Sequence, residues 1–144
     1  MKLLEMTTIQ KCIFCVQMVK LVKKQIVDEE ASRYIEKAID LSWKWMEKHL
    51  DISDELYDYL DNEEYGFTVF QESESNEIMI ATWNCIIDSF AYICRKAYEE
   101  QGAIYFPEPV ELVNDGTLIH LVDSYLICSG DNHKELDRLI SEIK

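Results

Sequence analysis

Apolar side chains recur every three to four residues along most of the chain, which is the spacing of one face of an α-helix. In the first half of the chain this pattern predicts three helices. They cover about residues 8–26, a stretch from Ala31 that ends near His49 or Leu50, and a short acidic stretch that Ser53 caps and that reaches about Asp61. A serine at such a position accepts a hydrogen bond from the first turn, and acidic residues just after it favour the helix dipole.

The pattern lapses in the middle of the chain and then returns. Residues 65–70 combine aromatic and β-branched side chains and predict a short extended strand. The most apolar stretch, about residues 77–100, predicts the central helix of the fold, because apolar side chains surround most of it. Ser75 or Asn76 caps its start, and Gly102 ends it. Its polar side chains form one narrow line, made of Asn84, Asp88, Tyr92 and Lys96.

The last third begins with an extended connector, Phe106-Pro107-Glu108-Pro109, because proline disfavours a helix at the residue before it. A helix at about residues 115–127 follows, Ser129-Gly130 interrupts the pattern, and a final helix carries Leu136 to Ile143. Six helical segments joined by short loops predict an all-α bundle, and the length predicts a single domain over residues 1–144. With 48% apolar residues, 4 Gly and 2 Pro, collagen-like and disordered chains are excluded.

Charge adds a functional hint to this fold. The chain carries 28 Asp and Glu against 14 Lys and Arg, a formal net charge of −14, which repels nucleic acid and anionic membranes and favours a basic partner. Residues 1–27 are locally basic, with five lysines and one glutamate. Residues 51–77, here called the acidic segment, hold ten acids and no Lys or Arg. The ten are Asp51, Asp54, Glu55, Asp58, Asp61, Glu63, Glu64, Glu72, Glu74 and Glu77.

The sequence predicts a soluble, cytoplasmic protein. Gln17 and Lys20 interrupt the apolar stretch near the N-terminus, and no small-residue cleavage site follows it, so we expect no secretory signal peptide. No uninterrupted apolar run reaches the roughly 18–20 residues of a membrane span. The five cysteines mostly fall in helical apolar patterns, which indicates reduced core residues rather than a disulfide framework.

Residues that could carry catalysis are few. Cys12 and Cys15 form a C-x-x-C pair that could bind metal or exchange disulfides, but no further ligands complete it and its apolar helical stripe favours core packing. His120 has apolar neighbours and is predicted to pack among them, whereas His49 and His133 are predicted to be surface residues. Without a phosphate-binding loop, a catalytic serine motif or a metal-ligand pair, we expect no enzyme activity, metal or cofactor.

Aromatic residues supply the candidate binding residues. Trp45 lies on an apolar stripe and Trp43 lies off it, so Trp43 is a candidate surface aromatic unless all three tryptophans close the core. Between residues 54 and 65, tyrosines alternate with acids, which favours a surface for a cationic protein: rings contribute buried area and carboxylates steer. This predicted surface, here called the acidic tyrosine surface, comprises Asp54, Glu55, Tyr57, Asp58, Tyr59, Asp61, Glu63, Glu64 and Tyr65. The alternative is a solvated acidic edge whose tyrosines are half packed into the core.

Short motifs between residues 77 and 127 carry a family resemblance. They are Ala81-Thr82-Trp83, Asp88, Tyr92, Ala97-Tyr98-Glu99 and the stretch from Phe106 to Glu111. Together with the chain length and helical character, they resemble the helical bacterial immunity proteins of immunity protein family six, which are encoded beside polymorphic toxins. The resemblance implies a cytosolic antidote that binds and blocks a cognate toxin, frequently a nuclease, with no catalysis of its own.

The negative charge of the chain predicts the same class of function, independently of the family resemblance. A toxin that acts on nucleic acid presents Lys and Arg to phosphates, so an inhibitor with dense carboxylates can occupy that basic surface. Two other hypotheses stay open. One is an acidic adaptor or nucleic-acid mimic that binds another basic protein; the other is a small helical thiol-redox protein that uses Cys12 and Cys15. Thiol titration of the folded chain separates the latter, because a packed pair reacts only on unfolding.

Overall fold

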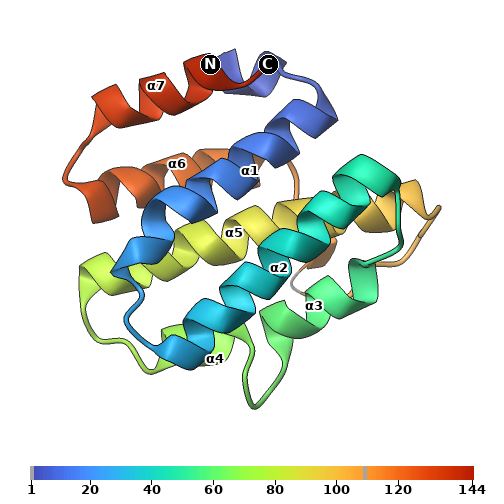
Figure 1. Cartoon of the computed structure of the whole chain (residues 1–144), viewed down its shortest axis with the longest axis horizontal. Helices are drawn as coiled ribbons and strands as arrows, with labels where there is room; N and C mark the ends of the chain where they lie inside the picture. Colours follow the sequence, from blue (N-terminus) through green and yellow to red (C-terminus); the bar gives the residue numbers. More distant parts are fainter. Residues whose placement is uncertain (1, 109) are drawn as a thin grey trace.

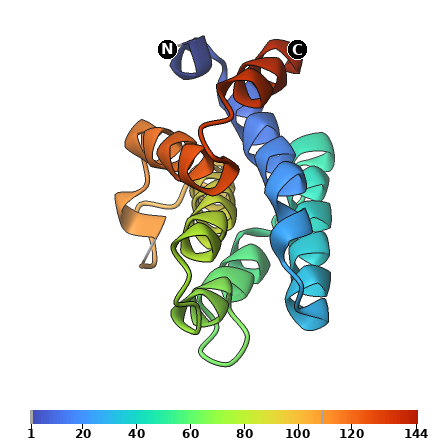
Figure 2. The same cartoon turned by 90° about the vertical axis from the view of Figure 1, so that its left-hand side faces the viewer.

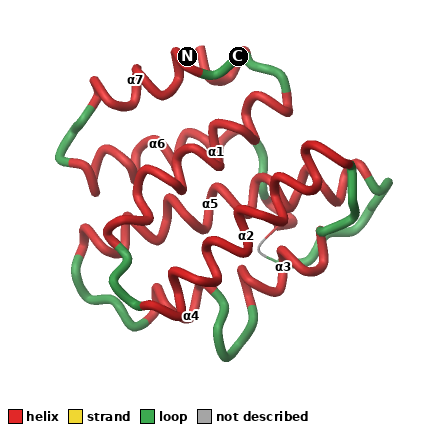
Figure 3. The backbone as a smooth tube through the Cα atoms, viewed as in Figure 1, coloured by secondary structure: helices red, strands yellow, loops and turns green. Residues whose placement is uncertain are grey.

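The computed structural model describes residues 2–108 and 110–144, and every regular element within them is helical (Figures 1 and 3). The α-helices are α1 Thr8–Val22, α2 Glu29–Lys48, α3 Ser53–Asp61, α4 Phe67–Glu72, α5 Glu77–Glu100, α6 Asp115–Ser129 and α7 His133–Glu142. Three 3₁₀ turns accompany them: η1 Lys2–Glu5, η2 Lys23–Gln25 and η3 Val110–Leu112. The predicted all-α bundle is confirmed, with seven described α-helices instead of about six.

Helix α5 is the centre of the bundle, as its apolar surroundings predict. It contacts α1, α2, α3, α4 and α6, and Figure 2 shows it between α6 on one side and the α1–α2 pair on the other. Phe90, Ile93 and Cys94 on α5 are fully buried. By length and composition alone α5 could also cross a membrane, but most of its apolar stretch is buried inside the bundle, as expected for a central helix.

The ends of α5 follow the predicted caps. The Asn76 side-chain oxygen accepts hydrogen bonds from the backbone N–H groups of Ile78 (2.8 Å) and Met79 (3.2 Å), so Asn76 rather than Ser75 is the N-cap. At the other end Gly102 adopts φ of 80°, and the next N–H, of Ala103, donates to the Tyr98 carbonyl at 3.1 Å. This left-handed ending satisfies the last carbonyls and starts the connector to α6.

The predicted strand at residues 65–70 is wrong, because Phe67–Glu72 forms helix α4. A helical turn brings Phe67 and Phe70 to one side, where the Phe70 ring stacks on Trp83 at 5.6 Å and the Phe67 ring stacks on Phe90 at 5.6 Å. Aromatic residues favour a strand only where a neighbouring strand packs against their side chains. Here the aromatic side of α5 receives these rings instead, so tertiary packing overrides local propensity.

Two smaller details also differ from the sequence prediction. The first helix ends at Val22 and continues as the 3₁₀ turn Lys23–Gln25 instead of running to residue 26. Ser53 is the first residue of α3 rather than its cap, and its backbone N–H (3.2 Å) and hydroxyl (2.7 Å) both donate to Asp51 Oδ1. The Asp51 carboxylate therefore orders the chain before α3, a role in which aspartate competes well with serine.

The polar line on α5 lies against the start and the middle of α6. The Tyr92 hydroxyl donates to Asp115 Oδ1 at 3.1 Å, and Asp88 Oδ2 contacts Nδ1 of His120. His120 is exposed, so the prediction that it packs among apolar residues is wrong. Its side chain is exposed at the edge of the α5–α6 contact, where the Asp88 carboxylate of α5 provides a polar partner. His49 and His133 are exposed, as predicted.

The 3₁₀ turn η1 and the end of α7 lie on the same side of the molecule, away from α3 and α4 (Figures 1 and 2). One hydrophobic cluster contains residues from every α-helix, including Phe14 of α1 and Leu139 of α7. Of the predicted connector, Phe106, Pro107 and Glu108 are in irregular backbone, and Pro109 lies outside the described residues. The arrangement leaves α3 and α4 at the end of the molecule opposite η1 and the end of α7 (Figures 1 and 2).

Candidate functional site

The acidic segment folds into α3, α4 and the loops that flank them. Nine of its ten carboxylate side chains are exposed, and that of Glu74 is half-buried. Among the described residues, no Lys, Arg or His forms an ion pair with any of the ten, although other acids of the chain do form such pairs. The negative charge of this region is therefore left facing solvent.

Tyrosine hydroxyls donate hydrogen bonds to three of these carboxylates. The pairs are Tyr98 with Asp54 (2.7 Å), Tyr57 with Asp61 (2.9 Å) and Tyr65 with Asp58. A phenol is a neutral donor, so it orients a carboxylate without cancelling its charge. Lysine or arginine in the same position would orient the carboxylate and neutralise it. The geometry therefore gives a fixed arrangement of uncompensated negative charge.

The same contacts raise the pKa of the tyrosine hydroxyls. Partial burial, together with the hydrogen bond to Asp61, raises the pKa of Tyr57 to about 12. The hydrogen bond to Asp58, followed by burial, raises the pKa of Tyr65 to about 12. Burial and the Asp54 contact also raise the pKa of Tyr98. All three phenols are thus neutral donors at physiological pH.

Helix α3 divides the acidic tyrosine surface into two parts. On one side Tyr59 and Tyr65 pack around Tyr34 of α2, with ring centroids 5.8 Å and 5.2 Å from that of Tyr34. On the other side the Tyr57 hydroxyl donates to the backbone carbonyl of Glu108 in the connector as well as to Asp61. The predicted tyrosines are all half-buried and do not form one cluster.

The remaining predicted acids point outward. Glu55, Glu63 and Glu64 are exposed, and their carboxylates accept no hydrogen bond from another described residue. Leu56 and Leu60 of α3 are fully buried and fix this helix on the core. The outward acids are therefore displayed on a helix and loop that the core holds in place.

Sequence reasoning missed two tyrosines of this region. Tyr98 lies 44 residues from its partner Asp54, and no local spacing connects them. Tyr34 donates to Glu30 at 3.2 Å, four residues earlier, just as Tyr57 donates to Asp61 four residues later. Residues four apart share one helix face, so this spacing was the signal that could have identified Tyr34.

The three tryptophans match neither alternative fully, because two are buried in the core and Trp43 is half-buried. Trp45 and Trp83 are buried, and the Trp45 indole donates to Glu100 Oε2 at 2.8 Å. Trp43 is half-buried, with the Lys20 ammonium 5.8 Å from its ring centroid. Two tryptophans therefore close the core, while the third lies at its edge between α1 and α2.

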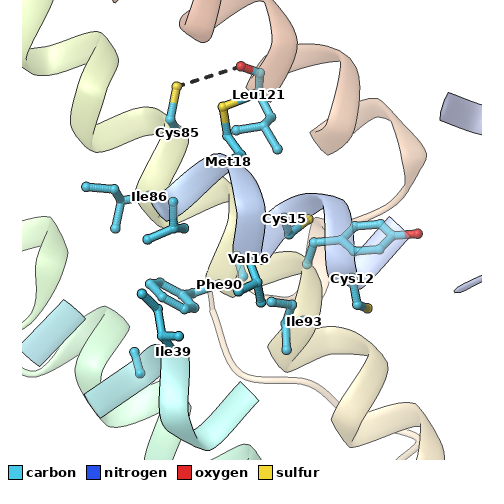
Figure 4. Close-up of a cluster of buried hydrophobic side chains, with 14 of the residues drawn as sticks. Cys12, Cys15, Val16, Met18, Ile39, Cys85, Ile86, Phe90, Ile93 and Leu121 are labelled. Carbon is cyan, nitrogen blue, oxygen red and sulfur yellow. Dashed lines mark hydrogen bonds between the residues drawn. The ribbon is translucent and has the colours of Figure 1, made fainter. Parts of the chain in front are cut away.

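Cys12 and Cys15 lie inside the core (Figure 4), and both are fully buried free thiols. Burial raises the pKa of Cys12 to about 12 and also raises that of Cys15. Both thiols are therefore protonated at neutral pH, which is the inert state of cysteine. No group of three or more His, Cys, Asp or Glu side chains in the described parts of the chain is arranged to hold a metal ion.

Comparison with known proteins identifies the family. No curated protein and no solved structure gave a significant match to this chain. The family model "Immunity protein Imm6" matches residues 10–128, a range that begins in α1, ends in α6 and includes the whole acidic segment and the connector. The match confirms the resemblance carried by the motifs around α5. The chain belongs to the Imm6 family of immunity proteins.

Proposed function

We propose that this chain is a cytoplasmic immunity protein that binds and neutralises a cognate bacterial toxin through the acidic tyrosine surface. The toxin is a basic protein, and a nuclease fits this description best. The chain acts by occupying the toxin and has no catalytic role, cofactor, membrane contact or direct nucleic-acid contact. Membership of an immunity protein family supports the class of function.

One observation carries the choice of surface: ten acids in 27 consecutive residues have no cationic partner within the described chain. Such crowding destabilises a fold through self-repulsion, so a fold that keeps it needs a compensating use. A nuclease must present Lys and Arg to phosphates, and carboxylates held at comparable density complement that surface.

Electrostatic complementarity also suits the task of an antidote. A catalytic toxin acts until it is captured, so the association rate matters as much as affinity. Steering by opposite charges raises association from about 10⁵–10⁶ to about 10⁸–10⁹ M⁻¹s⁻¹ at low salt. Glu55, Glu63 and Glu64 are the steering residues in this proposal, and the half-buried rings of Tyr57, Tyr59 and Tyr65 contribute contact area.

The test is to co-express this chain with the protein encoded immediately upstream. Restored growth and co-purification of the two proteins, with an affinity that falls as salt rises, are the expected results. An acidic adaptor or nucleic-acid mimic would bind basic proteins without restoring growth. Failure of both rescue and binding would contradict the proposal.

A charge-reversal variant tests the surface. E55K/E63K/E64K should lower the association rate by about 10-fold or more at low salt, because these acids are exposed and make no structural contact. The matched control is D40K/D123K/D137K, which changes the net charge equally at exposed positions on α2, α6 and α7. Equal association rates for the two variants would show that net charge, and not this surface, attracts the toxin.

A further inference from the structure

The segment that links α5 to α6, residues 101–114, extends the predicted connector on both sides and is called the connector from here on. Its described residues display apolar side chains that the fold does not bury. In the described chain four large apolar side chains are at least 80% exposed, and three of them are Ile104 (80%), Tyr105 (87%) and Leu112 (85%) of the connector. Scattered exposed apolar residues are normal on soluble proteins. Here three lie within nine residues of one linking segment, and exposed apolar side chains that gather in one region mark an interaction site more often than a scattered residue does.

The two limbs of the connector are brought together by one side chain. The Arg95 guanidinium lies 3.7 Å from the centroid of the Phe106 ring and donates to the Glu111 carbonyl at 2.8 Å. Tyr105 precedes Phe106 and Leu112 follows Glu111 directly. Ile104 and Tyr105 therefore lie on one limb and Leu112 on the other, and Arg95 joins the two limbs.

The connector is also held firmly in place. Val110 and Val113 are buried, and the Tyr57 hydroxyl donates to the Glu108 carbonyl, which ties the connector to α3. A backbone fixed by such contacts presents its outward side chains without a further ordering cost on binding. The exposure of Ile104, Tyr105 and Leu112 is thus a property of a pinned segment and not of a loose loop.

Acidic side chains flank these residues, and the cation nearest to them, Arg95, is ion-paired with Glu99 at 3.4 Å. Glu108 and Glu111 of the connector and Asp54 of α3 are exposed, and no described Lys, Arg or His forms an ion pair with any of them. A second copy of this chain would bring like charges together, and an anionic membrane would be repelled. The surroundings fit an apolar recess bordered by Lys and Arg on another protein.

We propose that Ile104, Tyr105 and Leu112 form the apolar anchor that docks into the toxin, beside the acids that attract it. This inference rests on the proposed function and deepens it, because it assigns the two phases of binding to two neighbouring surfaces. The acids act before contact and set the association rate. The apolar anchor acts after contact and sets the dissociation rate, as buried apolar and aromatic residues do at protein interfaces.

The experiment measures both rate constants against a catalytically inactivated form of the protein encoded immediately upstream. I104S/Y105S/L112S should raise the dissociation rate by about 100-fold or more while association changes by less than about 3-fold. E55K/E63K/E64K should show the reverse pattern. The matched control V27S/I119S/I127S removes three other exposed apolar side chains and should leave both rates near the wild-type values.

Each outcome has a separate meaning. If the wild-type chain neither binds nor rescues growth, the proposed function and this inference both fail. If the wild-type chain binds and I104S/Y105S/L112S dissociates at the same rate, only the anchor fails. Sedimentation of the isolated chain and flotation with phosphatidylcholine vesicles test the other occupants: a dimer or a vesicle complex that the connector variant abolishes would assign these side chains elsewhere and overturn the inference. Unchanged helicity and melting temperature confirm that the variant is folded.

Discussion

Helices α3 and α7 are both short, amphipathic and rich in acids, yet they treat their charges in opposite ways. On α7, Arg138 lies between two acids: its Nε donates to Glu135 at 3.1 Å and its Nη1 donates to Glu142 at 2.8 Å. These contacts lower the pKa of Glu135, chiefly through the hydrogen bond from Arg138. On α3 the acids face tyrosine hydroxyls or solvent, and no described base pairs with them.

Helices α3 and α7 therefore use their carboxylates in two different ways. The acids of α7 stabilise their own helix through residues three and four positions away. The acids of α3 contribute no such pairing, so their charge stays available to another molecule.

The largest expected effect concerns how firmly the acidic segment, here through Phe67 of α4, and helix α7 are anchored. Phe67→Ala should lower the free energy of unfolding by about 3–5 kcal/mol, because Phe67 is fully buried between Trp83 and Phe90. Leu139→Ala on α7, which packs mainly on α1, should cost less, about 2–3 kcal/mol. Denaturant unfolding measures both values. A larger loss for Leu139→Ala would show that the acidic region is not the more firmly packed of the two.

High pH should affect the tyrosines that hold the carboxylates beside α3. Since folding raises the pKa of Tyr57 and Tyr65 to about 12, the fold favours their protonated forms. The resulting stability is complete below the ordinary tyrosine pKa of about 10 and is lost as pH rises through about 12. Absorbance titration near 295 nm should show late-ionising tyrosines, and Y57F/Y65F should lower their number by two. Ionisation of every tyrosine near pH 10 with the fold intact would contradict these contacts.

The smallest expected effect is a change in stability, of opposite sign, when carboxylate charge is removed beside α3 or on α7. E55Q/E63Q/E64Q should raise the free energy of unfolding at low salt, by less than about 1 kcal/mol, because it relieves repulsion. E135Q/E142Q should slightly lower the melting temperature, because it removes the partners of Arg138. Both changes should shrink in about 1 M salt, where charges are screened. The same sign for both variants would remove the contrast between α3 and α7.

Local sequence signals were sufficient for the central helix. Asn76 and Gly102 mark the two ends of α5, and the apolar residues between them have one periodicity over more than six turns. Capping and periodicity depend only on neighbouring residues, so they can be identified without tertiary information. The same reasoning failed for α4, because the helical state of Phe67 and Phe70 depends on Trp83 and Phe90, which follow later in the chain.

The candidate site was predictable in composition but not in geometry. The alternation of tyrosines and acids on α3 was visible in the sequence, and the pairing of Tyr57 with Asp61 follows from a spacing of four. The link from Tyr98 to Asp54 joins residues 44 apart, and the link from Tyr57 to Glu108 joins residues 51 apart. Only the packing of α5 against α3 creates these contacts, so the role of the connector could not be derived beforehand.

The placement of the chain ends has a practical consequence. The 3₁₀ turn η1 and the end of α7 lie on the same side of the molecule, away from α3 and α4 (Figures 1 and 2). Joining the ends by a flexible linker that spans the gap between them would give a circular polypeptide with fewer unfolded conformations and with the same surface geometry. Cyclisation would therefore produce a more heat-resistant protein whose acidic segment stays unobstructed.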